Sequence, residues 1–265
     1  MSAARTCNVS VAGPPGARPM VFVHGFGCDQ HMWRHVVPAF ERDYFVVLLD
    51  LVGAGGSDLA AYDEERHATL HGHAADVLDV LHELELQDVV LVGHSVAAMI
   101  GVLAHIAEPD TISRLVLITP SARYLDTDSY TGGFSESDID DLLNLMASNH
   151  LGWQGPLSAL VLPPTERPEA AAEVEQSFCR TRPDIAAHFA KVTFLSDNRA
   201  DLPHVSAPTL VIQSRVDAIA PPSAVTFVYD TIAEASLEAV DTTGHCPHLS
   251  APGATVAAIQ RFLRP

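Results

Sequence analysis

The chain has 265 residues, of which 48% are hydrophobic, and it carries a formal net charge of −18 at pH 7. This length and apolar content fit one large α/β domain or two small ones, and they argue against a globally disordered chain. The excess of acidic residues argues against nucleic acid or an anionic membrane surface as a partner, because their phosphates would be repelled.

Short apolar runs alternate with helical patterns along the first part of the chain, and this alternation is typical of a mostly parallel sheet covered by helices on both faces. The glycine-rich turn at 53–56 lacks the G-x-G-x-x-G spacing, so we do not predict a dinucleotide site there. We expect strands at 20–23, 45–50, 89–92 and 113–118, and helices at 31–40, 69–86 and 98–108.

The pattern changes after residue 120, where β-rich apolar runs stop for about 80 residues. Proline-punctuated helical segments take their place, and we interpret 121–200 as a helical lid inserted after a sheet strand. The sheet-containing core would then comprise 1–120 and 201–265. We expect lid helices at 137–148, 168–179 and 183–195, further strands at 208–213 and 235–240, and a closing helix at 254–263.

One short motif carries most of the chemical information. Gly93-His94-Ser95-Val96-Ala97 lies between an apolar strand-like run and a helix-like run. A serine on a sharp strand-to-helix turn is the nucleophile elbow of α/β-hydrolases, and its flanking residues must be small. Ala97 stands where the general motif has glycine, which is the smallest possible change. We therefore predict Ser95 as a nucleophile.

A serine nucleophile needs a base and an acid that orients it, in the order serine, acid, histidine along an α/β-hydrolase chain. Asp217 directly follows the strand expected at 208–213 and is the preferred acid, with Asp201 and Asp241 as competitors. His245 lies in the loop between the last strand and the closing helix and is the preferred base, with His248 as its rival.

The oxyanion of an acyl-transfer intermediate needs two backbone donors. One is predicted to be the N–H of Val96, because it directly follows the nucleophile. The other is predicted to be the N–H of Phe26, in the glycine-rich loop 24–27 after the first buried strand.

We predict neither a metal site nor an organic cofactor. The only tight group of histidines is His67, His71 and His73, and we interpret it as a solvated face at the start of a helix. The four cysteines are scattered without a C-x-x-C pair, and residues 1–6 lack an apolar signal-peptide core. These features indicate reduced thiols in a cytoplasmic protein with no membrane partner.

Five segments together resemble one family. They are 25–30, 93–101, 120–125, 132–134 and 244–252, and they look like the RsbQ group of bacterial hydrolases, which is similar to the plant strigolactone and karrikin receptors. The resemblance runs from about residue 9 to residue 263. Its members tolerate a small non-glycine residue at the position of Ala97.

The resemblance implies an α/β-hydrolase core with a V-shaped lid of four helices over an apolar pocket. By matching positions, Phe26, Phe134, Trp153 and Phe194 would line that pocket. Leu157 would also face the substrate, at a position where another aromatic residue is expected.

Two functions remain open at this point. The first is a serine hydrolase that cleaves small apolar esters, lactones or butenolides through an acyl-enzyme. The second, implied by the resemblance, is a ligand sensor with slow or single-turnover hydrolysis and a protein partner such as a signalling phosphatase. Carbon–carbon bond hydrolysis and perhydrolysis fit the same residues, whereas a dehalogenase or epoxide hydrolase would need an aspartate in place of Ser95.

Overall fold

The computed structural model describes residues 2–148, 152–165 and 167–264. Its centre is a seven-stranded sheet with the order β1-β3-β2-β4-β5-β6-β7, in which β1 is antiparallel to β3 and the other neighbours are parallel. The strands are β1 Ser10–Ala12, β2 Pro19–Val23, β3 Phe45–Leu49, β4 Val89–His94, β5 Ile112–Ile118, β6 Thr209–Val216 and β7 Ala235–Thr243.

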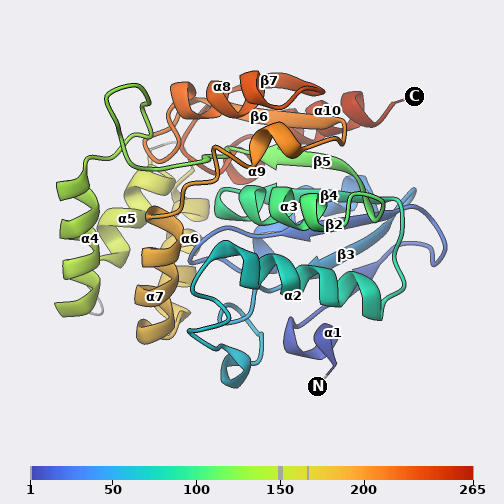
Figure 1. Ribbon diagram of the computed structural model, residues 1–265, viewed down its shortest axis with the longest axis horizontal. Coiled ribbons are helices and arrows are strands. Elements are labelled where there is room, and N and C mark those ends of the chain that lie inside the picture. The colour runs from blue at the N-terminus through green and yellow to red at the C-terminus, as the bar shows by residue number, and fades with distance from the viewer. Residues whose placement is uncertain (1, 149–151, 166, 265) are drawn as a thin grey trace.

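Helices cover both faces of this sheet, and further helices lie beyond one end of its strands (Figure 1). The helices of the core are α1 Ala3–Thr6, α2 Leu70–Glu83, α3 Val96–Ala107, α8 Pro222–Thr231, α9 Pro247–Ser250 and α10 Pro252–Leu263. The helices between β5 and β6 are α4 Glu136–Ser148, α5 Gln154–Val161, α6 Pro168–Arg180 and α7 Pro183–Phe194. The predicted α/β-hydrolase fold with an inserted four-helix lid is confirmed.

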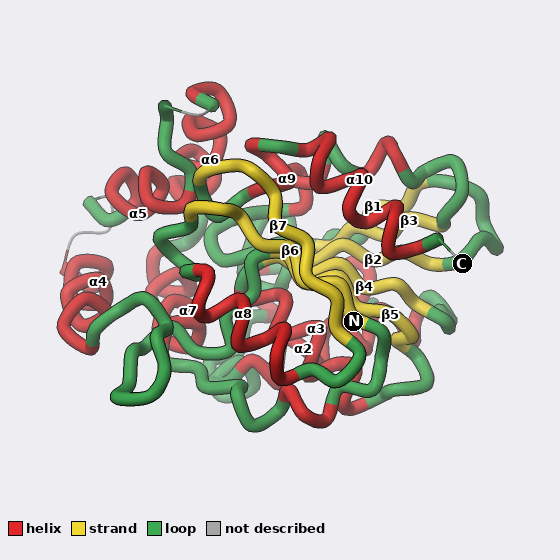
Figure 2. The backbone as a smooth tube through the Cα atoms, turned by 90° about the horizontal axis from the view of Figure 1, so that it is seen from above, coloured by secondary structure: helices red, strands yellow, loops and turns green. Residues whose placement is uncertain are grey.

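Alternate residues of each buried strand enter different halves of the core, because side chains of a strand point to opposite faces. In β2, Val21 and Val23 pack on the side of α2, α3 and α8, whereas Met20 and Phe22 pack on the side of α10 and the lid. Figure 2 shows α9 and α10 on one side of the sheet and α2, α3 and α8 on the other. A parallel sheet covered on both faces explains why its strands are almost wholly apolar.

The prediction of an α-helix at 31–40 is wrong. The segment forms two short 3₁₀ helices instead, Gln30–Trp33 and Val37–Ala39. Pro38 lies inside the second of these short helices. A proline removes a backbone donor and disfavours α conformation in the residue before it, which is Val37 here.

Four α-helices of the structure fall outside the segments expected from the sequence: the one-turn helices α1 and α9, and the longer helices α5 and α8. Helix α5 contains Gly155 and Pro156, and α8 begins directly after Pro221, so both look like loops at the level of sequence. Proline is tolerated in the first turn of a helix because the N–H it lacks has no partner there. No helix in the described part of the chain is long and apolar enough to cross a membrane.

Candidate active site

The turn between β4 and α3 holds Ser95 in a strained backbone conformation. Its φ is 58° and its ψ is −124°, outside the regions that a residue with a side chain normally occupies. A Cβ on Gly93 would lie 2.4 Å from the carbonyl oxygen of Ala97, so the turn requires a glycine there. Val96 is the first residue of α3, and its N–H therefore has no acceptor within the helix.

We expect Gly93→Ala to damage the turn. The added methyl group must push the Ala97 carbonyl away, and overpacking of this kind costs about 1–3 kcal/mol of unfolding free energy. Esterase activity should fall with it, because the serine moves. The matched control is Gly253→Ala, where a Cβ meets no atom within 4 Å and stability should stay within about 0.5 kcal/mol. Urea unfolding would measure the stability of each variant, and hydrolysis of p-nitrophenyl acetate would measure its activity. Equal stability and equal activity of Gly93→Ala and Gly253→Ala would contradict the expectation.

The predicted nucleophile, base and acid form one chain of hydrogen bonds. Nε2 of His245 lies 2.7 Å from Oγ of Ser95, and Nδ1 of His245 lies 2.7 Å from Oδ2 of Asp217. The other carboxylate oxygen of Asp217 accepts from the backbone N–H groups of Ile219 and Ala220 at 2.8 and 3.0 Å. All of these contacts are buried, so each group is held in one orientation relative to the next.

The competing residues lie elsewhere. Asp201 accepts a hydrogen bond from the side chain of Asn198, before β6. Asp241 pairs with Arg215 at the surface, with 84% of its side chain exposed. His248 is buried in α9, and its ring nitrogens have no hydrogen-bond partner in the described part of the chain.

The backbone of His245 is fixed from three sides. Its carbonyl oxygen accepts from Oγ1 of Thr119 and from Nε2 of His94, both at 2.9 Å. Its N–H donates to the carbonyl of Val161, at the end of lid helix α5, at 2.6 Å. The position of the histidine therefore depends on the sheet edge and on the lid together.

We expect His248 to make the protein less stable in acid. Burial lowers the pKa of His248 to about 3, with further lowering by the neighbouring His245 and Arg34. In the unfolded chain the same group titrates near its ordinary value of 6.5, so the unfolded state takes up the proton first. The part of the unfolding free energy that depends on a neutral His248 is fully present above pH 6.5. It is lost as the pH falls toward 3, at about 1.4 kcal/mol per pH unit.

Urea unfolding as a function of pH measures this effect. The control is His248→Phe, which keeps an aromatic ring where His248 packs on Trp33 at 4.7 Å between ring centroids. The variant should lose stability less steeply than the parent as the pH falls below 6.5. Parallel profiles for the two proteins would contradict the assignment.

A small cavity adjoins the nucleophile. Its volume is about 20 Å³, which is room for about one water molecule. A substrate therefore enters only if the lid or its side chains move. The cavity is lined by Phe26, Cys28, His94, Ser95, Tyr124, Leu157, Val161, Phe178, Thr193, Phe194, Ile219 and His245.

The pocket residues predicted from the sequence divide into two groups. Phe26, Leu157 and Phe194 line the cavity. Phe134 and Trp153 do not line it. Phe134 packs against Phe194 with ring centroids 5.8 Å apart, and Trp153 packs against Phe26 at 6.0 Å, so both support the wall from behind.

Tyr124 is a site residue that sequence reasoning missed. Its hydroxyl lies 3.3 Å from Oγ of Ser95, and the side chain is buried. Burial raises the pKa of Tyr124, so its hydroxyl stays protonated at neutral pH. The residue lies in the segment 120–125 that carried the family resemblance, and this was the one signal that could have found it.

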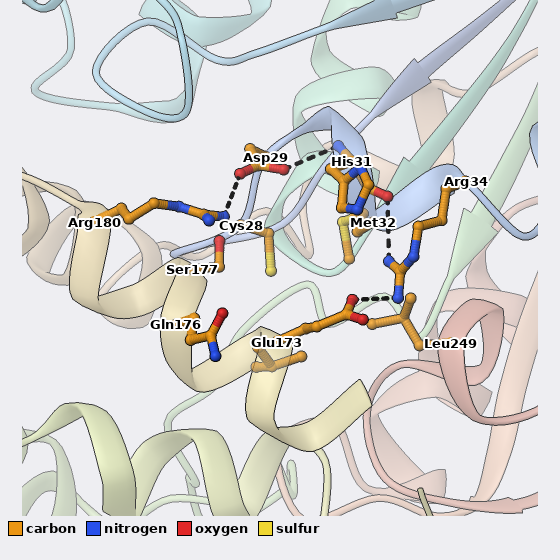
Figure 3. Close-up of a pocket in the computed structure, with 11 residues that line it drawn as sticks. Cys28, Asp29, His31, Met32, Arg34, Glu173, Gln176, Ser177, Arg180 and Leu249 are labelled. Carbon is orange, nitrogen blue, oxygen red and sulfur yellow. Dashed lines mark hydrogen bonds and ion pairs between the residues drawn. The ribbon is translucent and has the colours of Figure 1, made fainter. Parts of the chain in front are cut away.

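The loop after β2, which includes Phe26, is braced against lid helix α6. Oγ of Ser177 donates to the carbonyl of Gly27 at 2.8 Å, and Arg180 pairs with Asp29 at 2.9 Å. Figure 3 shows the pair of Arg180 and Asp29 beside a groove of about 260 Å³, where Arg34 and Glu173 form a second ion pair across the same boundary. The lid thus holds the loop that carries a predicted oxyanion donor.

The prediction that the histidines at 67–73 form a solvated face is wrong. His67 and His73 are fully buried, and only His71 is exposed. The ring of His67 stacks on Tyr62 with centroids 4.7 Å apart, and the ring of His73 packs against Phe189 of α7 at 4.5 Å. The lid covers this end of α2, which a reading of the helix by itself could not show.

Comparison with known proteins identifies the family. The family model described as "Alpha/beta hydrolase family" matches residues 20–259. A karrikin insensitive 2 receptor of Petunia hybrida is 39% identical, with 97% of this chain and 95% of that protein covered. A strigolactone esterase of Pisum sativum is 37% identical, with 92% of each chain covered. A solved hydrolase from Oleispira antarctica is 36% identical with a TM-score of 0.95, over 98% of this chain and 95% of that one. The chain therefore belongs to the alpha/beta hydrolase family, in the group that includes the strigolactone and karrikin receptors.

Proposed function

We propose that the protein hydrolyses small apolar esters, lactones or butenolide-type compounds through an acyl-enzyme on Ser95. The observation that carries this proposal is the buried chain from Ser95 through His245 to Asp217, with both contacts at 2.7 Å. This is the arrangement in which a serine hydroxyl is activated by a base whose tautomer is set by a carboxylate.

In the first half of the reaction, Oγ of Ser95 attacks the carbonyl carbon while Nε2 of His245 takes the hydroxyl proton. Asp217 stabilises the imidazolium that results. The N–H groups of Phe26 and Val96 are assigned to the oxyanion. The carbon–oxygen bond to the leaving group then breaks, and His245 returns the proton to the leaving oxygen, which stays attached to the acyl group when the substrate is a lactone.

In the second half, water enters and attacks the acyl carbonyl, again with His245 as the base. The ester bond to Ser95 breaks, and the serine recovers its proton.

The class of substrate is supported by the apolar wall of the cavity and by the names of relatives, which include strigolactone esterases and an enol-lactonase. We assign the core to 1–120 with 201–265, the lid to 121–200, and the location to the cytoplasm, where the buried free thiols of Cys7, Cys28 and Cys246 would stay reduced.

A second candidate is a ligand sensor that uses the same residues to capture its ligand. Two observations favour it: the cavity beside Ser95 has a volume of only about 20 Å³ and is lined in large part by lid residues, and a relative bears the name of a receptor. A lid that must move to admit ligand is a natural two-state element. The partner would be a protein, such as the signalling phosphatase that the RsbQ resemblance implies.

A time course with a fluorogenic butenolide and with p-nitrophenyl acetate separates the two candidates. Sustained turnover of either substrate supports the hydrolase. One burst stoichiometric with the protein, followed by near-silence, supports the sensor, because the acyl group is then held. Absence of both burst and turnover, with no covalent adduct on Ser95 by mass spectrometry, would overturn the proposal.

A further inference from the structure

Three buried side chains with metal-ligating atoms face one another where α2 begins. His67 lies in the turn before the helix, and His73 and Asp76 lie one helical turn apart on α2. Their ligand atoms all lie within 4.8 Å of one another. Both histidines are fully buried, and Asp76 is 8% exposed. The group is remote in sequence from the proposed catalytic residues and has no role in the reaction described above.

His73 is the unusual member of this group. Neither of its ring nitrogens has a hydrogen-bond partner among the described residues, although the side chain is fully buried. A buried polar group without a partner is rare and calls for a ligand or another explanation. A neutral imidazole keeps a lone pair on one ring nitrogen, and this atom can bind a ligand.

His67 and Asp76 are already oriented as metal ligands usually are. Nδ1 of His67 lies 2.8 Å from the carbonyl oxygen of Asp63, and Nε2 lies 2.7 Å from Oδ2 of Asp76. Oδ1 of Asp76 accepts from Arg66 at 2.6 and 2.9 Å, which leaves Oδ2 to face the histidines. Outer hydrogen bonds of this kind fix the ring and carboxylate orientations of metal ligands.

We propose that His67, His73 and Asp76 bind one divalent transition-metal ion, such as Zn²⁺, with water as the fourth ligand. Two imidazoles and one carboxylate are a ligand set that suits such ions. At metal–ligand distances of about 2.1 Å, tetrahedral ligand atoms lie about 3.4 Å apart. The ring nitrogens of His73 have no hydrogen-bond partner among the described residues, so the ring can turn toward the ion without breaking a hydrogen bond. The ion replaces the proton between His67 and Asp76, and that proton leaves to solvent.

An acidic surface cleft supplies a path for a cation. The cleft has a volume of about 320 Å³, and its walls include Asp76, Asp79 and Glu83. Carboxylates of one sign along a cleft raise the local concentration of cations. Above the site, His73 packs against Phe189 of lid helix α7, so an ion would lie beneath the lid rather than beside Ser95.

The test uses untagged full-length protein that has been stripped with a chelator and dialysed. Zn²⁺ is titrated by calorimetry, and Co²⁺ is titrated with visible absorption as the readout. We expect one ion per chain, release of a proton, and a rise in the unfolding temperature. His73→Phe should weaken binding by about a hundredfold or more, while it keeps a ring against Phe189. The matched control is His71→Ala, which removes an exposed histidine of the same helix and should bind like the parent.

A second group with ligand atoms, His94, Cys246 and His248, allows a sharper discrimination because it contains sulfur. X-ray absorption of the Zn²⁺-loaded parent should show nitrogen and oxygen neighbours only. A sulfur neighbour at about 2.3 Å would assign the ion to the second group and overturn the inference. No uptake by the parent, or equal affinity in His73→Phe, would overturn it as well. The absorption measurement needs no variant, so it decides the question even if His73→Phe does not fold.

Discussion

Replacement of Ser95 by alanine should lower kcat for p-nitrophenyl acetate by about 10⁶-fold. The reason is that the hydroxyl oxygen forms the covalent bond, and it is the hydroxyl that lies 2.7 Å from Nε2 of the base His245. Among the described residues, Tyr124 is the one other hydroxyl within hydrogen-bond distance of that oxygen, but burial raises its pKa and keeps it protonated. The residual rate should come from the oxyanion donors and from substrate binding, as it does when nucleophiles are removed from related triads.

The control for this variant is Ser223→Ala, which removes an exposed hydroxyl that donates a long hydrogen bond of 3.4 Å to the carbonyl of Thr131. Its activity should match the parent. A fluorophosphonate probe should label the parent and Ser223→Ala once, and should leave Ser95→Ala unlabelled. Hydrolysis by Ser95→Ala at the parental rate would refute the assignment of Ser95 as nucleophile.

Replacement of Asp217 by asparagine should lower kcat by about 10⁴-fold with little change in fold. The amide can still accept from the N–H groups of Ile219 and Ala220, so the loop keeps its shape. The amide nitrogen, however, can face Nδ1 of His245 as a donor and so favour the wrong tautomer of the base. It also cannot stabilise the imidazolium that forms when Ser95 attacks.

The matched control is Asp241→Asn, which removes the charge of the competing aspartate at the surface. This pair with Arg215 is exposed, so the change should alter stability by less than about 1 kcal/mol and leave kcat unchanged. Circular dichroism and urea unfolding would establish that both variants are folded. A large loss in Asp241→Asn with normal activity in Asp217→Asn would exchange the roles of the two residues.

Local patterns were sufficient for most of the fold and for the triad candidates. Ser95 could be found because its turn needs small neighbours, and the structure shows why: Gly93 has no room for a Cβ. Asp217 and His245 could be ranked because the carboxyl ends of parallel strands meet at one sheet edge, where residues that follow β4, β6 and β7 come together. These are consequences of short-range sequence signals combined with a regular topology.

What the lid does could be decided only by tertiary structure. Phe134 and Trp153 were expected to line the cavity, yet they pack behind the residues that do. Several aromatic side chains lie close together in the lid, and only their tertiary packing decides which of them line the cavity. The same lid buries His67 and His73, which the sequence of α2 alone made look solvated. The sequence thus determined the sheet, the elbow and the order of the polar residues, since these depend on neighbours along the chain. Burial, cavity shape and the histidine group depend on contacts between segments far apart in sequence, and only the folded chain brings those together.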